Sequence, residues 1–125
     1  MTGRRVLVVD DDDDIRMLAA MSLGRVGGFD VRSCSGGGEA LEVAADWLPE
    51  AVLMDVRMPG QDGPTTSQLL AAGPTTAHIP VIFLTASLRG EDKTALTALG
   101  AAGVLSKPFD PMTLPTDVAD LLGWT

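Results

Sequence analysis

Residues 6–14 read Val6-Leu7-Val8-Val9-Asp10-Asp11-Asp12-Asp13-Asp14, an apolar run followed at once by five aspartates. A near-continuous β-branched run is typical of a strand buried on both faces. Aspartate is a poor strand residue and a good helix starter, so the pattern predicts a buried strand that gives way to a helix. Crowded carboxylates also repel one another, and two unit charges about 4 Å apart cost roughly 4 kcal/mol near a protein surface. The run therefore predicts a cation at the strand end.

The same alternation continues along the chain. Further short apolar runs predict strands at residues 29–33, 51–54, 81–84 and 103–105. Helix-length segments lie between and after them, at about 13–26, 38–47, 64–72, 91–99 and 115–122. Strictly alternating strands and helices at this spacing predict an α/β fold in which helices cover both faces of a parallel sheet.

Length and charge narrow the possible functions. A chain of 125 residues with a mean hydropathy of +0.22 predicts one globular domain over 1–125, with its core at about 5–122. No apolar stretch approaches membrane-spanning length and none resembles a signal peptide, so we expect no membrane association and a cytoplasmic location. The net charge of -8 argues against direct binding of nucleic acid. The single Cys34 has no partner for an internal disulfide.

Polar residues follow four of the predicted strands. They are Asp10 and Asp11, Asp55, Thr85 and Lys107. Because ligands bind at the carboxyl ends of parallel strands, these side chains are expected to converge on one crevice. Carboxylate oxygens without His or Cys suit Mg²⁺, with Mn²⁺ as a possible substitute. An aspartate such as Asp55 can act as a nucleophile that forms an acyl phosphate. The Thr85 hydroxyl and the Lys107 ammonium would stabilise the transferred phosphoryl group.

Four segments together resemble the receiver domain of two-component response regulators. They are Val8-Val9-Asp10-Asp11, Leu53-Met54-Asp55-Val56-Arg57-Met58-Pro59-Gly60, Phe83-Leu84-Thr85-Ala86 and Ser106-Lys107-Pro108-Phe109. The resemblance runs from about residue 5 to 122. It implies a flavodoxin-like, CheY-like doubly wound (βα)5 fold with a five-stranded parallel sheet in the order 2-1-3-4-5.

The resemblance also implies roles at the acidic site. Asp55 would be the residue phosphorylated by a histidine kinase or a histidine phosphotransfer protein. Asp10 and Asp11 would organise Mg²⁺ together with Asp55, Asp11 directly and Asp10 through water. Arg57 would contribute its backbone carbonyl to the metal.

Switch residues follow from the same resemblance. Thr85, with Ala86 beside it, would move toward the phosphoryl group after transfer, and Lys107 would pair with that group. The Lys107–Pro108 peptide bond is expected to be cis. Arg57 and Ser87 occupy positions that tune the lifetime of the acyl phosphate.

The chain departs from the family pattern at Val104, where receivers typically place an aromatic ring that turns inward. Valine is stiff at χ1 and too small to act as a rotating lever. Signal readout is therefore expected to use backbone and helix shifts, or a different partner face.

Other interpretations remain open. Asp12, Asp13 and Asp14 are expected to cap the first helix rather than to bind metal. The chain is expected to be a stand-alone receiver with no output domain, a signalling switch rather than an enzyme, and a monomer or a weak phosphorylation-dependent dimer. Its downstream target would be another protein. The alternatives are a phosphatase of the haloacid-dehalogenase type, and a receiver-like interaction module that is never phosphorylated.

Overall fold

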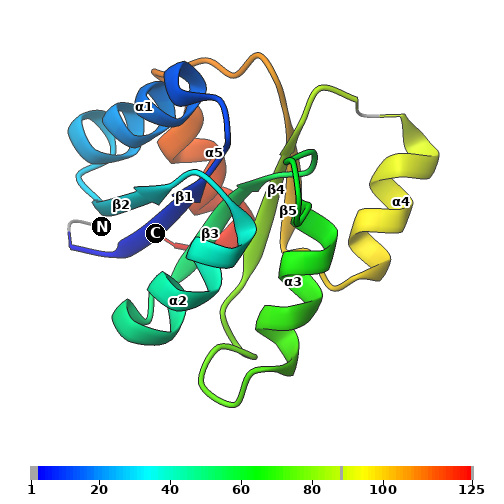
Figure 1. Ribbon diagram of the computed structural model, residues 1–125. Helices are drawn as coiled ribbons and strands as arrows, with labels where there is room; N and C mark the ends of the chain where they lie inside the picture. The colour runs from blue at the N-terminus through cyan, green and yellow to red at the C-terminus, as the bar shows by residue number, and fades with distance from the viewer. Residues whose placement is uncertain (1–2, 88, 125) are drawn as a thin grey trace.

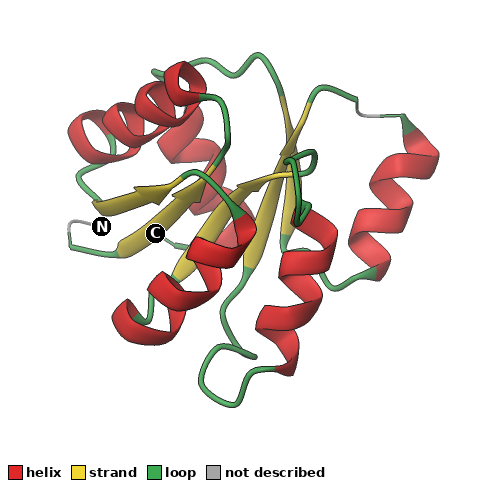
Figure 2. Cartoon of the chain, in the orientation of Figure 1, coloured by secondary structure: helices red, strands yellow, loops and turns green. Residues whose placement is uncertain are grey.

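The chain is built around a central parallel sheet of five strands (Figures 1 and 2). The computed structural model describes residues 3–87 and 89–124, with only the backbone described at Glu91. The strands are β1 (Arg5–Val9), β2 (Asp30–Cys34), β3 (Ala51–Asp55), β4 (Val81–Thr85) and β5 (Gly103–Ser106). Their order is β2-β1-β3-β4-β5, with every neighbouring pair parallel. The predicted flavodoxin-like topology is confirmed.

Helices connect the strands and cover the sheet on both sides (Figure 1). They are α1 (Asp13–Met21), the π-helical turn η1 (Ser22–Val26), α2 (Gly37–Trp47), α3 (Gly63–Ala72), α4 (Gly90–Ala98) and α5 (Leu114–Leu122). The segment predicted as one helix over 13–26 is thus helical throughout, but its last turn widens into the π form. Within the described residues no helix is both long and apolar enough to cross a lipid bilayer.

Two apolar layers, one on each face of the sheet, make up the core. One contains Ala40 and Ala44 of α2, Leu70 of α3 and Leu96 of α4. The other contains residues of α1, η1 and α5, among them Leu23 and Val118. All five residues of β3 and all five of β4 are buried, which explains their lack of hydrophobic alternation. β2 lies at the edge and has a mostly exposed pattern.

Helix starts and stops follow local chemistry. Asp12 caps α1, since its Oδ1 accepts hydrogen bonds from the backbone N–H groups of Asp14 and Ile15. Asp62 caps α3 by accepting from the N–H of Thr65 at 2.9 Å, and a proline occupies the first turn of that helix. These caps fix the two loops that carry the acidic residues.

Candidate functional site

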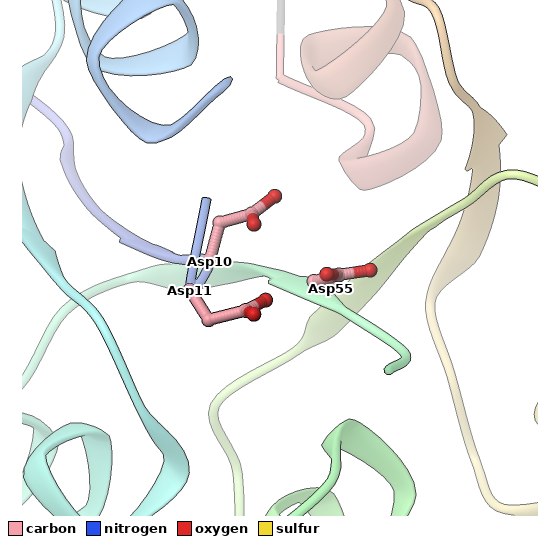
Figure 3. Close-up of side chains that lie close together, drawn as sticks. All are labelled: Asp10, Asp11 and Asp55. Atoms are coloured by element: carbon pink, nitrogen blue, oxygen red, sulfur yellow. The ribbon is translucent and has the colours of Figure 1, made fainter. Parts of the chain in front are cut away.

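Three carboxylates meet at the carboxyl edge of the sheet. Asp10 and Asp11 directly follow β1, and Asp55 is the last residue of the neighbouring strand β3 (Figure 3). One oxygen of each lies within 4.8 Å of the other two. Asp10 and Asp55 are buried, whereas Asp11 is exposed. The cluster is therefore open to solvent on the side of Asp11.

Lys107 lies against this cluster. Its Nζ is 2.9 Å from Oδ2 of Asp10 and 3.3 Å from Oδ2 of Asp55. The residue follows β5, its N–H donates to the Thr85 carbonyl at 2.8 Å, and the Lys107–Pro108 bond is cis. Burial disfavours the charged ammonium, but the close negative charge of Asp10, followed by that of Asp55, outweighs this effect and raises the pKa of Lys107. The ammonium consequently bridges the two buried carboxylates.

The pKa of Asp55 is raised above its ordinary value. Burial is the largest cause, and the charge of Asp10 adds to it. Lys107 and a hydrogen bond from the backbone of Arg57 act in the opposite direction. The environment thus contains more negative charge than one ammonium neutralises, which favours the binding of a further cation.

The donor set fits a hard divalent cation. All three side chains are carboxylates, the ligands that Mg²⁺ and Mn²⁺ prefer over softer sites. Oδ2 of Asp10 is buried and makes no well-aligned hydrogen bond, although the Lys107 ammonium lies beside it. A buried carboxylate oxygen in this state has a free lone pair for a metal-bound water or an ion.

The loop after β1 contains an arginine that the sequence did not single out. Nη1 of Arg16 donates to the Asp10 carbonyl at 2.8 Å, and its Nη2 forms an ion pair with Asp13. The N–H of Asp12 donates to Oδ1 of Asp10 at 2.9 Å. These bonds fix the Asp10 backbone and one of its carboxylate oxygens. An arginine three residues after Asp13, at a spacing that pairs side chains on one helix face, was the available signal.

The turn from β3 into α3 presses closely on Asp55. A methyl group at Gly63 would lie within 2.3 Å of the Asp55 carbonyl oxygen, so only glycine fits there. The N–H of Gly63 also donates to the Val56 carbonyl at 2.9 Å. Gly60 has a φ of 78°, in the left-handed region that favours glycine. Gly63 therefore allows the start of α3 to pack directly against the Asp55 backbone.

Thr85 ends β4 beside the cluster, but its hydroxyl is engaged elsewhere. The Oγ1 atom donates to the Ser87 carbonyl at 3.2 Å and accepts from the Ser87 N–H at 3.1 Å. Ala86, between them, is exposed. Oγ of Ser87 donates in turn to Oδ2 of Asp92 on α4 at 3.0 Å. Asp92 had no sequence signal, because its contact depends on the path of the loop.

A cavity of about 520 Å³ extends from Asp55 toward α4. Its lining includes Asp55, Arg57, Thr85, Lys107 and Asp92. Val104, the position without the family's ring, is partly buried against the core layer of α2, α3 and α4. The structure thus brings the predicted phosphoacceptor, hydroxyl and ammonium around one space large enough for a phosphoryl group.

Comparison with protein families gives a match over nearly the whole chain. Residues 6–119 match the model described as "Response regulator receiver domain". The response regulator PleD of Caulobacter vibrioides is 39% identical over 118 residues, which cover 94% of this chain and 26% of PleD. The transcriptional regulatory protein GltR of Pseudomonas aeruginosa is 36% identical over 96% of this chain and 49% of GltR. The chain spans about a quarter to a half of these relatives.

Solved structures agree with this match. The chemotaxis response regulator CheY4 of Vibrio cholerae superposes with a TM-score of 0.89 at 31% identity, covering 96% of this chain and 99% of CheY4. The BeF3-activated N-terminal receiver domain of RstA from Klebsiella pneumoniae gives 0.84 at 28% identity, covering 95% and 98%. The similarity in both cases extends over the whole sheet and its helices.

Proposed function

The chain belongs to the family of response regulator receiver domains, and we propose that it accepts a phosphoryl group on Asp55 and signals through the conformational change that follows. The observation that carries this proposal is the position of the Asp55 carboxylate. It lies on a cavity of about 520 Å³, close to two further carboxylates and 3.3 Å from the Lys107 ammonium. Phosphoryl transfer depends on such placement of charge around a nucleophile.

The transfer is a displacement at phosphorus. An Asp55 carboxylate oxygen attacks the phosphorus of the donor, a new O–P bond forms, and the bond from phosphorus to the donor's nitrogen or oxygen breaks with its electron pair. Lys107 is positioned to neutralise the oxygens of the transferred group. Its attraction, together with the Arg57 backbone hydrogen bond, favours the ionised and nucleophilic form of Asp55 against the effect of burial.

A divalent cation completes the site in this proposal. Asp10, Asp11 and Asp55 would hold Mg²⁺, or Mn²⁺ in its place, and the Arg57 carbonyl is the proposed backbone ligand. When bound, the cation supplies positive charge that offsets the three carboxylates and the incoming phosphoryl oxygens. Thr85 would then donate its hydroxyl to the phosphoryl group, with Ala86 beside it.

Receiver domains interact with histidine kinases and histidine phosphotransfer proteins. We propose a protein of this kind as the donor and a protein–protein contact as the output. In this scheme the chain turns over only its own phosphoryl group, and Arg57 and Ser87 set its lifetime. PleD and GltR are regulators about two to four times the length of this chain, and their own activities are outside this proposal.

Labelling with a small phosphodonor tests the proposal. We expect acetyl phosphate to phosphorylate the protein in the presence of Mg²⁺, with one phosphoryl group per chain detected by intact mass. Chelation by EDTA and the substitution Asp55→Asn should each abolish the signal. Asp46→Asn, at an exposed residue of α2, is the matched control and should label normally. Full labelling of Asp55→Asn would show that another residue accepts the group.

A further inference from the structure

The hydroxyl of Thr85 has a single proton, and this proton is already donated in a hydrogen bond within the loop after β4. Oγ1 donates it to the Ser87 carbonyl while accepting from the Ser87 N–H, so the hydroxyl is held at both its donor and acceptor sides. In the proposed function, this hydroxyl donates to the phosphoryl group on Asp55. The Ser87 carbonyl must therefore be released before Thr85 can donate to the new group.

Ser87 is itself held by α4. Its Oγ donates to Oδ2 of Asp92 at 3.0 Å, and Nε of Arg89 lies 3.6 Å from the same oxygen. Hydrogen bonds to a carboxylate are stronger than neutral ones. Asp92 lies in the first turn of α4, where a negative charge interacts favourably with the helix dipole. The first turn of α4 thus anchors Ser87, and Ser87 anchors Thr85.

The cavity provides the space for a second arrangement. Thr85, Ser87 and Asp92 all line it together with Asp55. The Thr85 hydroxyl therefore has open space beside it on the side of Asp55. A rotation of the Thr85 side chain away from Ser87 would bring the hydroxyl into this space.

We propose that Asp92 is a positioning residue that, through Ser87, holds Thr85 in the arrangement of the unphosphorylated protein. This inference rests on the proposed function and concerns the regulation of the same site. Loss of the Ser87–Asp92 bond raises the fraction of molecules whose Thr85 is free to donate. Apparent affinity for a phosphoryl mimic rises in proportion to that fraction.

Binding of beryllofluoride in the presence of saturating Mg²⁺, followed by ¹⁹F NMR, measures this fraction. We expect Asp92→Ala and Ser87→Ala each to bind beryllofluoride roughly 3- to 10-fold more tightly than wild type. The double variant should differ from either single variant by less than about twofold, because all three remove the same bond. Asp117→Ala, which removes an acidic residue from the first turn of α5, is the matched control and should bind as wild type does.

Mg²⁺ affinity separates positioning from general disruption of the site. Asp10, Asp11 and Asp55 are unchanged in these variants, so Mg²⁺ should bind each of them as it binds wild type. Unchanged beryllofluoride affinity, additive effects in the double variant, or a parallel change in Mg²⁺ affinity would each overturn the role of Asp92. If wild type binds no beryllofluoride and Asp55 is never phosphorylated, the proposed function fails instead.

Discussion

Lys107→Met tests how far one ammonium stabilises the folded protein. The substitution keeps an extended apolar stem but removes the charge that lies 2.9 Å from Asp10 and 3.3 Å from Asp55. The Lys107 side chain is 18% exposed and Asp10 only 2%, so water cannot simply replace the ammonium. We expect the variant to be less stable than wild type in EDTA, because two adjacent carboxylates lose their shared partner.

The size of the loss follows from the distances and from proton binding. At an effective dielectric constant of about 20 the two attractions are gross terms of about 6 and 5 kcal/mol, and desolvation of the ammonium offsets much of them. The loss also has an upper limit, since one carboxyl can bind a proton instead. Protonating an aspartate of ordinary pKa, about 3.9, at pH 7 costs about 4 kcal/mol. We therefore expect a loss of about 2–4 kcal/mol, or roughly 8–16 °C in Tm.

Proton binding by a carboxyl group in Lys107→Met also predicts that the stability of this variant depends on pH. In the variant, a carboxyl of raised pKa binds a proton in the folded state, whereas the unfolded chain stays ionised down to about pH 3.9. Stability should then increase as the pH falls, by up to about 2.7 kcal/mol between pH 7 and pH 5. Wild type should change less over this range, because Lys107 offsets part of the effect that raises the pKa of Asp55.

Urea unfolding in EDTA at pH 5, 6 and 7 measures both quantities. Lys93→Met is the matched control, because it removes the chain's other lysine from an exposed position on α4. The reasoning is refuted if Lys107→Met and Lys93→Met have equal stability at pH 7. A loss that does not vary with pH would assign the effect to packing rather than to charge.

Three further predictions concern neighbouring features. Mg²⁺ at ten times its Kd should add about 1.4 kcal/mol to the free energy of unfolding, which differential scanning calorimetry would record as a rise of about 5 °C in Tm. Asp11→Asn should reduce this rise at the same Mg²⁺ concentration. In Gly63→Ala the new methyl group would meet the Asp55 carbonyl, so the protein should be about 1–3 kcal/mol less stable in urea unfolding and should be labelled by acetyl phosphate at least tenfold more slowly. Gly38→Ala is the control, because Gly38 has open space around it, and this variant should show neither effect. Burial raises the pKa of the Cys34 thiol from 9.0 to about 11, so the unfolded state loses its proton first. Between pH 9 and pH 11 wild type should therefore lose roughly 2 kcal/mol more stability than Cys34→Ala, as urea unfolding at the two pH values measures.

The sequence specified the centre of the sheet because β1, β3 and β4 are apolar on both faces. β3 and β4 are continuous apolar runs without hydrophobic alternation, which indicates strands buried on both faces. Each ends in a polar residue at the carboxyl edge of the sheet, where the candidate site lies. The first and last residues of several elements differ by one position, as at β2, predicted at 29–33 and found at Asp30–Cys34. Such small differences arise because hydrogen-bond pairing, rather than hydrophobicity, decides where a strand ends.

Side-chain partnerships were less accessible from sequence. That Lys107 would approach the acidic residues follows from its place after β5, but its sharing between Asp10 and Asp55 depends on rotamers. The Ser87–Asp92 bond depends on how the loop after β4 turns into α4. Contacts of this kind join residues through loop geometry, for which hydrophobic periodicity gives no information.

The valine at position 104, where receivers typically have an aromatic ring, leads to an expectation about which part of the molecule transmits the signal. All five aromatic residues lie in the described part of the chain, and Phe83 is fully buried within β4 while Phe109 packs on the layer of α1 and α5. Val104 lies against the layer of α4, where a β-branched side chain has one preferred rotamer and little reach. A ring rotating beside Thr85 is thus not available, and we expect the displacement to pass through the loop after β4 into α4. Only Leu96 of α4 is buried among the side chains described, so we expect this helix to be displaced at a lower cost than helices with several buried side chains.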